Sequence, residues 1–297
     1  MNTNAKSLVK LSVQGQVSPH VRRDQFLIGH HGKPVVLPGV GGITYNVKIG
    51  DAVFGWAGDH IEPGVSIKAV GDKKVTENTG LNVLACIGNS ARVISGDAKG
   101  DTGVVTGKHG GIEHVLIYFP QQTLEKLTMD DKILIQGFGQ GLEIAELPDV
   151  RIMNLDPDLL NSMPLSLEND TLEAPVVGII PPELMGSGIG APGCYSGDYD
   201  LTTADMEVIK RCGLENLRFG DLVAIQDTDN SYGRCFRKGA VSIGVVVHSD
   251  CEKAGHGPGI TTIFTSASGK IRPKKVSAAN IGDYLSLTVP DSHQEEA

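Results

Sequence analysis

Four polar segments of the sequence carry residue types that could do chemistry. The first runs from Asp59 to Glu62 and reads Asp-His-Ile-Glu. In extended chain His60 and Glu62 point to the same side, because side chains alternate with a period of two. An imidazole and a carboxylate placed in this way can bind a divalent metal, or act as a general base with an orienting acid. The alternative is a turn in which Asp59 bonds nearby backbone, and the Pro-Gly pair that follows favours it.

The second segment extends from His248 to Gly259, directly after an apolar run that we expect to form a core strand. His256 is followed by Gly257 and Gly259, so its backbone is uncrowded and nearby amides could meet an anion. Cys251 could be a nucleophile beside a histidine, although a buried thiol more often serves packing. A Gly-Pro turn with an exposed histidine is the alternative interpretation.

The third segment, Gly186–Asp200, contains a Gly-x-Gly-x-Gly run. It is not a dinucleotide-binding fingerprint, because no helix opens at the glycines and no βαβ pattern surrounds them. Asp198 and Asp200 lie two residues apart and could offer oxygen ligands to a hard metal or contacts to a substrate. They could equally belong to an Asp-rich turn that leads into a helix capped by Thr202 or Thr203.

The fourth segment, Ala91–Gly111, has two alternating runs around a Gly-Asp-rich centre and therefore predicts a hairpin. The pattern resembles the hairpin of KOW modules and implies a small barrel, without establishing RNA binding. Lys108 and His109, with nearby amides, could hold an anion or a substrate. The segment lacks the Walker A frame, which excludes a P-loop.

The elements that must position these segments are mainly short strands separated by some of the 38 glycines. We therefore predict a mainly β, α+β protein with an N-terminal barrel-like domain over residues 1–140 and a C-terminal α+β domain over residues 141–297. A strand is expected over Leu81–Ile87, and a short helix over Pro157–Met163 with Asp156 as its N-cap. Trp56, the single tryptophan, could wall a pocket or belong to the core.

Several motifs together resemble the domain-of-unknown-function 4438 family. They are Pro38–Asn46, Gly55–Ser66, Gly197–Asp200 and Ala254–Gly259. The resemblance extends over about residues 20–285. It implies a β-rich, barrel-like N-terminal domain and a C-terminal α+β domain, and it implies no established activity.

A looser resemblance is to amide hydrolases of the acetamidase/formamidase type. These enzymes have a Gly-rich segment that leads to an aspartate and a later Gly-Asp-Gly-His loop, to which Gly186–Asp200 and Gly255–Gly259 are similar. The residue order around His256 differs. The resemblance therefore serves as an analogy of reaction type only.

The overall composition narrows the class of partner. A formal net charge of −9 argues against nucleic acid and anionic membranes as partners. The five cysteines show no CxxC spacing, and there is no apolar signal segment or 18-residue apolar run, so we expect a reduced, cytoplasmic setting without membrane contact. A symmetric homo-oligomer is also compatible with the pattern and is expected.

The leading hypothesis is a metal-assisted hydrolase of a small amide or related C–N bond, with loops of both domains forming the site. The divalent ion, with zinc as one option, would be held by His60, Glu62, Asp198, Asp200 and His256. Of these, His60, Glu62 and His256 would also act in catalysis. The expected substrate contacts are Trp56, Asp59, Lys108, His109, Gly257 and Gly259. The alternative is a non-catalytic protein that binds a small anion or a nucleic acid.

Overall fold

A computed structural model describes residues 1–22, 24–69, 74–186 and 193–287. Its first large element is a sheet of antiparallel strands in the order β1-β9-β6-β7-β8-β5, and β5 pairs back onto β1. Six strands therefore form a closed barrel, which leaves no free edge between them. The bounds are β1 Leu11–Val17, β5 Gly64–Lys68, β6 Ser90–Val93, β7 Thr102–His109, β8 His114–Tyr118 and β9 Lys132–Gly137.

The barrel is closed around aliphatic side chains. Val65, Val105, Ile117 and Ile133 belong to one buried cluster inside it, as the alternation along their strands requires. The short strand β4 (Ile43–Thr44) extends the sheet beside β5, and the helix α2 (Gln121–Leu124) follows β8. The predicted barrel-like N-terminal region is confirmed.

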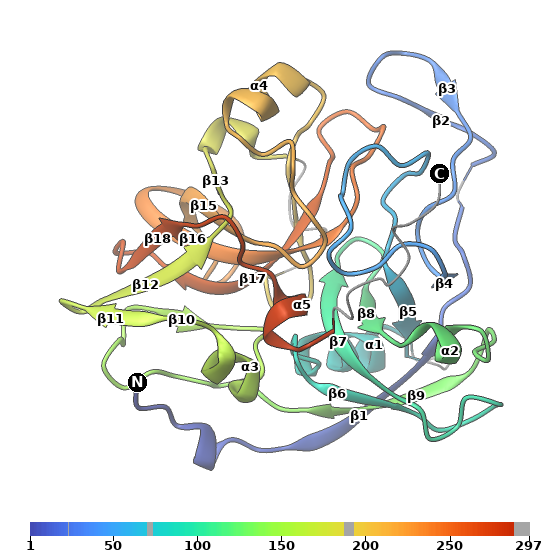
Figure 1. Ribbon diagram of the computed structural model, residues 1–297, viewed down its shortest axis with the longest axis horizontal. Helices are drawn as coiled ribbons and strands as arrows, with labels where there is room; N and C mark the ends of the chain where they lie inside the picture. The colour runs from blue at the N-terminus through green and yellow to red at the C-terminus, as the bar shows by residue number, and fades with distance from the viewer. Residues whose placement is uncertain (23, 70–73, 187–192, 288–297) are drawn as a thin grey trace, which may run out of the picture.

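The second large sheet lies beside the barrel in Figure 1 and is formed by strands from the C-terminal half. Its order is β10-β17-β16-β15-β13, with β14 paired to β17. A smaller sheet, β11-β12-β18, flanks it. The bounds are β10 Arg151–Ile152, β11 Ser166–Glu168, β12 Thr171–Val176, β13 Gly178–Ile180, β14 Tyr199–Asp200, β15 Leu222–Asp229, β16 Cys235–His248, β17 Gly259–Ser266 and β18 Ile271–Lys275.

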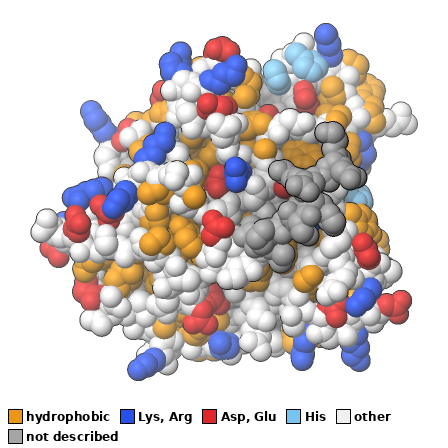
Figure 2. Space-filling view, in the orientation of Figure 1, with side chains coloured by type: hydrophobic (Ala, Val, Ile, Leu, Met, Phe, Trp, Pro, Cys, Tyr) orange, Lys and Arg blue, Asp and Glu red, His pale blue; other side chains and the backbone are white. Residues whose placement is uncertain are grey.

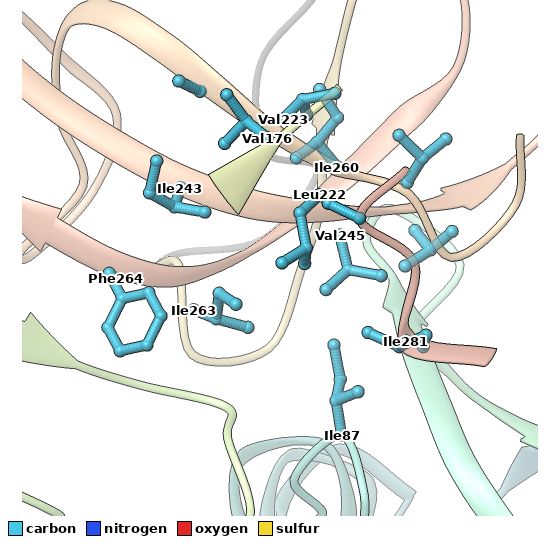
Figure 3. Close-up of a cluster of buried hydrophobic side chains, with 14 of the residues drawn as sticks. Ile87, Val176, Leu222, Val223, Ile243, Val245, Ile260, Ile263, Phe264 and Ile281 are labelled. Carbon is cyan, nitrogen blue, oxygen red and sulfur yellow. The ribbon is translucent and has the colours of Figure 1, made fainter. Parts of the chain in front are cut away.

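A second apolar cluster fills the space on this sheet. Val223, Ile243, Val245 and Phe264 are fully buried there, and Ile87 reaches the same cluster from the first half of the chain (Figure 3). Short helices border the sheets: α3 Pro157–Ser162, α4 Met206–Arg211 and α5 Ile281–Tyr284, with 3-10 turns η1 Ala5–Ser7 and η2 Pro182–Leu184. The predicted mainly β class with a C-terminal α+β region is confirmed.

Strand β7 of the barrel joins the two parts of the fold. The Oγ1 of Thr261 on β17 donates to the carbonyl oxygen of Lys108 at 3.0 Å and accepts from its backbone N–H at 3.2 Å. Gly107 lies against Val247 on β16, where a Cβ would overlap that side chain. This contact brings the end of β7 to the end of β16, and the candidate site is formed there.

Two local expectations are wrong. The segment expected as a strand over Leu81–Ile87 instead begins with the last turn of helix α1 (Lys74–Leu84), and its last three residues follow the helix. A short apolar run does not distinguish a buried strand from one buried helix face, and Leu81 and Ala85 face the barrel core one turn apart. Helix α4 is capped by Asp205, whose side chain accepts from two backbone amides, rather than by Thr202 or Thr203.

Other features follow the expectation or remain open. Asp156 caps α3 through a bond from the Asp158 amide, as predicted. The hairpin from β6 to β7 is present. The boundary near residue 140 remains a prediction, and most of the Gly-x-Gly-x-Gly run, at 187–192, lies outside the described residues. No helix among the described residues is long and apolar enough to cross a membrane.

Candidate metal centre

Three histidines from distant parts of the chain meet at one point. His60 lies in the loop before β5, His109 is the last residue of β7, and His248 is the last residue of β16. One nitrogen from each ring lies within 4.8 Å of the other two. The ring centroids of His109 and His248 are 4.3 Å apart, and those of His60 and His248 are 5.0 Å apart. This spacing is compact enough for one ion to contact all three rings.

Each of the three rings is oriented by an acceptor on its Nδ1. His60 Nδ1 lies 3.1 Å from Oδ2 of Asp59. His109 Nδ1 lies 2.5 Å from an oxygen of Glu62, and His248 Nδ1 lies 2.9 Å from the carbonyl oxygen of Ser249. A metal-binding histidine typically donates its second N–H to a carboxylate or a backbone carbonyl in this way. The Nε2 atoms are therefore the nitrogens available for a common ligand.

Two carboxylates complete the cluster. Asp198 accepts from the Gly110 amide at 2.6 Å with one oxygen, and its other oxygen lies 2.8 Å from Nε2 of His248. Asp200, on β14, lies 3.3 Å from the same Nε2. Asp198, Asp200 and His248 form a second compact set of donor atoms. The predicted pair of oxygen ligands thus lies against an imidazole.

His256 joins the cluster from its solvent side. Its Nδ1 lies 2.7 Å from Oδ2 of Asp200 and 3.3 Å from Nε2 of His60. The His256 side chain is 21% exposed, whereas that of His248 is 0% exposed. The two loops that the sequence placed in one site, around residue 60 and around residue 256, do converge.

Glu62 occupies a different position from the one expected. It is fully buried behind His109, and its oxygens also meet Nδ1 of His114, the Ser66 hydroxyl and the Gly41 amide. Its position therefore suits orientation of His109 rather than direct contact with an ion. The extended-chain argument is wrong here, because His60 has a φ of 54° and lies in a turn.

The electrostatics of the cluster reflect its burial. Burial raises the pKa of the Asp59 and Asp200 carboxyls, but neighbouring imidazoles, together with the Cys251 thiol and the Glu252 amide at Asp59, outweigh it and hold both pKa values well below the ordinary range. Burial opposes protonation of His248, yet Asp198 and Asp200 raise its pKa well above 6.5. Burial and the neighbouring imidazoles lower the pKa of His60. The carboxylates of the cluster therefore carry negative charge. A bound cation could balance this charge in place of protons on the imidazoles.

A cavity of about 520 Å³ opens onto these groups. Its polar residues include Asp59, His60, His109, Asp198, Asp200 and His256. Its apolar residues are Val21, Phe26, Leu27, Leu37, Val40 and Ile112. A volume of this size suits a small organic molecule.

Two expected substrate contacts are absent from this cavity. Trp56 is not among the lining residues; it packs on the apolar core, and its indole N–H donates to the Ala52 carbonyl at 2.7 Å. Lys108 is fully buried and points elsewhere, because its Nζ donates to Asn154 Oδ1 and the Tyr195 carbonyl, each at 2.7 Å. The interpretation of Lys108 as an anion contact is therefore wrong.

Two glycines expected as substrate contacts serve close packing. A Cβ at Gly257 would overlap the Leu201 carbonyl and the Thr203 hydroxyl. A Cβ at Gly259 would overlap both Asp198 and His248. Neither glycine is among the described residues that line the cavity. Glycine is needed at both positions because other groups pack closely against the backbone there.

Cys251 lies at the edge of the cluster, in a third set of donor atoms with His60 and His256. Its thiol donates to Oδ1 of Asp59 at 3.1 Å. Burial and the Asp59 charge raise the pKa of this thiol far above its ordinary value. A thiol in this state is a poor nucleophile, which disfavours covalent catalysis by Cys251.

Sequence reasoning did not place His248 in the donor set. The histidine ends a long, buried apolar strand, and that position was a usable signal, because loops that leave core strands often carry functional residues. His109 was expected as a substrate contact, and the structure instead places it among the imidazoles of the centre.

The fold and the site define a two-part β protein with a candidate metal centre between its parts. The chain belongs to the DUF4438 family: residues 26–161 match its N-terminal domain of unknown function and residues 162–285 its C-terminal domain. The resemblance drawn from the motifs is thus confirmed. A solved structure titled "Crystal structure of TM1086" is 50% identical, covers 96% of this chain and 99% of its own, and superposes with a TM-score of 0.91. No curated protein matches the chain.

Proposed function

We propose that the protein is a metal-dependent hydrolase of a small amide or related C–N bond. The observation that carries the proposal is the geometry of three imidazoles, His60, His109 and His248. Each has its Nδ1 held by an acceptor, and their rings meet beside two aspartates at a cavity. Nitrogen and oxygen donors of this kind suit zinc and related divalent ions.

The residues around the centre fit the roles that hydrolysis requires. A divalent ion held there supplies Lewis acidity, polarising a carbonyl and lowering the pKa of a bound water to about 7. His256 borders the cavity and is oriented by Asp200, so it can transfer a proton to or from the reacting atoms. Asp59 and Glu62 hold the rings of His60 and His109 in place through their Nδ1 atoms.

The alternative, a bare anion-binding protein, has lost its main support. Lys108, the cation on which that interpretation depended, is paired inside the fold. The cavity is instead lined by Asp24, Asp59, Asp198 and Asp200, which repel an anion in the absence of a metal. The same charges attract a divalent cation.

The metal content of the purified protein, measured by inductively coupled plasma mass spectrometry, tests the proposal. The wild type should carry stoichiometric metal, and the His60→Ala and His248→Ala variants should each lose it. His31→Ala is a matched control, because His31 lies outside the donor sets. A folded wild type that takes up no metal would contradict the centre. A metal-loaded protein that cleaves no member of a panel of small amides would contradict the hydrolase alone.

A further inference from the structure

The cavity over the centre combines two kinds of lining. Its histidines and three of its four aspartates come from four separate segments, at residues 59–60, 109, 198–200 and 256, whereas five of its six apolar residues come from the single segment 21–40. That segment contains the two-stranded hairpin of β2 (Leu27–Ile28) and β3 (Pro34–Val35). The hairpin lies at the upper right of the molecule in Figure 1, apart from the large sheets. One small unit therefore supplies most of the apolar surface next to the metal centre.

One face of the hairpin segment lines the cavity, and the other face is exposed to solvent. Leu27 and Leu37 are half-buried and line the cavity. Ile28 and Val36, their direct neighbours in the chain, are 54% and 70% exposed and do not line it. Leu27 and Ile28 are consecutive residues of β2, so alternation along that strand places them on opposite faces, and Val36 and Leu37 follow the end of β3. Figure 2 shows apolar side chains and histidines gathered at this corner of the surface.

The hairpin is held against the loops of the centre. The Asp59 amide donates to the Pro38 carbonyl at 2.9 Å, and Gly39 lies so close to the Asp59 carbonyl that a Cβ could not fit. On the other side the His30 amide donates to the Glu252 carbonyl at 2.7 Å. Asp59 also orients His60. The apolar lining residues of segment 21–40, called here the apolar wall, are thus positioned by the same backbone that positions a candidate metal ligand.

The charge of the cavity lining disfavours a ligand that carries a negative charge away from the metal. Arg22 is the one Arg or Lys side chain among the described lining residues. Its guanidinium donates to the carbonyls of Leu37 at 2.8 Å and Gln25 at 3.0 Å, so it braces the hairpin. Asp24 lies beside it at the cavity. Among the described lining residues, a carboxylate or phosphate at the end of the ligand away from the metal would meet one cation, which already donates to backbone carbonyls, and four aspartates.

From these observations we infer that the substrate is an uncharged small molecule with an apolar body of several carbons, which the β2–β3 hairpin recognises through Leu27 and Leu37. The inference rests on the proposed function, because the reacting carbonyl of that substrate must reach the metal. It adds the class of substrate: the amide carries an alkyl or aryl group rather than a charged one.

A pair of zinc-binding probes tests the inference by calorimetry on the zinc-loaded protein. Acetohydroxamate and hexanohydroxamate have the same chelating head and differ by four methylenes. Full burial of those methylenes would tighten binding by about 200-fold, and we expect a gain of at least about tenfold. Succinic monohydroxamate, whose chain ends in a carboxylate, should bind more weakly than the uncharged butyrohydroxamate.

Substitutions at two neighbouring residues of β2 test which face of the hairpin contacts the chain of the probe. Leu27→Gln should remove at least about threefold of the gain for the longer chain and leave acetohydroxamate affinity unchanged. Ile28→Gln, on the outer face of the same strand, should change neither affinity. If Leu27→Gln does not fold, the wild-type comparison of the two chain lengths still decides whether the substrate has an apolar body.

The outcomes separate the inference from the function on which it rests. Equal affinity for both chain lengths, or tighter binding of the charged chain, would overturn the apolar substrate and leave the metal centre standing. Equal effects of Leu27→Gln and Ile28→Gln would overturn the role of the hairpin. A protein that takes up no zinc and binds no hydroxamate would instead overturn the proposed function.

Discussion

Glu62 and His109 are joined by a hydrogen bond of 2.5 Å between Oε1 and Nδ1, with both side chains enclosed in the protein. His114 approaches the same carboxylate at 3.0 Å. These two imidazoles hold the pKa of Glu62 well below its usual range, although burial alone would raise it. The carboxylate therefore stays charged and fixes the His109 ring with its other nitrogen directed to the centre.

The Glu62→Gln variant should bind zinc about 10- to 100-fold more weakly than the wild type. The amide keeps the shape of the side chain but loses the charge that orients His109 and makes it a stronger ligand. Competition with a chromophoric chelator measures the affinity. Glu125→Gln, at an exposed position, is the control. An unchanged zinc affinity in a folded Glu62→Gln protein would contradict the role of Glu62.

Zinc binding should release a proton at pH 7. Because Asp198 and Asp200 raise the pKa of His248 well above 6.5, the metal-free ring holds its proton more strongly than an ordinary imidazole does, and it must lose that proton to become a ligand. The pKa of His60 is lowered, so His60 contributes no proton. The affinity should rise by roughly tenfold per pH unit until the pH exceeds the folded-state pKa of His248.

Calorimetry in buffers of different ionisation enthalpy measures the proton release. The observed binding enthalpy should vary with the buffer, with a slope of at least one proton per zinc. An enthalpy that is the same in every buffer at pH 7 would contradict a protonated His248 in the metal-free protein.

Lys108 gives a separate dependence of stability on pH. Burial lowers its pKa from 10.5 to about 8. Between these values the unfolded chain binds more protons than the folded one, so the free energy of unfolding rises as the pH rises through this window. The rise is at most about 3 kcal/mol from this one group.

The Lys108→Met variant should lack that rise. Denaturant unfolding at pH 7.5 and pH 10, compared between the variant and the wild type, measures the difference. The two hydrogen bonds that the variant loses, to Asn154 and the Tyr195 carbonyl, shift its stability at every pH and do not alter the slope. Parallel pH curves for the two proteins would show that Lys108 titrates normally.

The elements of the fold could be predicted where local chemistry decides them. Asp156 followed by proline indicated the start of α3, and alternation around Gly-rich turns indicated the barrel hairpins. Helix α1 was missed because the apolar run from Leu81 fits a buried strand or one helix face equally well. Packing of Leu81 against the barrel core decides between them, and one sequence does not contain that information.

The sequence was enough to predict which polar loops form the candidate site. It was not enough to predict which residues face an ion and which lie behind its ligands. His60 and His256 were placed together because imidazoles recur in Gly-rich loops, and the structure brings them within 3.3 Å. Glu62 was taken as a ligand and lies instead behind His109. Spacing along the chain does not show which carboxylate faces an ion and which faces the ligand's far nitrogen, since that depends on how β5 and β7 are placed in the barrel.

Gly259 lies where two candidate ligands leave no room for a side chain. It is paired with Asp200 across β14 and β17 and with His248 across β16 and β17. A Cβ there would overlap both Asp198 Oδ2 and His248 Nε2, so Gly259→Ala must displace at least one of them. We expect the variant to lose most of its zinc while it keeps a cooperative thermal transition, because the overlap is with side chains beside the end of β16 and the start of β17. Gly80→Ala, in helix α1 where a Cβ meets nothing within 4 Å, should keep its zinc and gain up to about 1 kcal/mol of stability. Equal zinc content in the two variants, measured by mass spectrometry of the folded proteins, would show that Asp198 and His248 do not hold the metal.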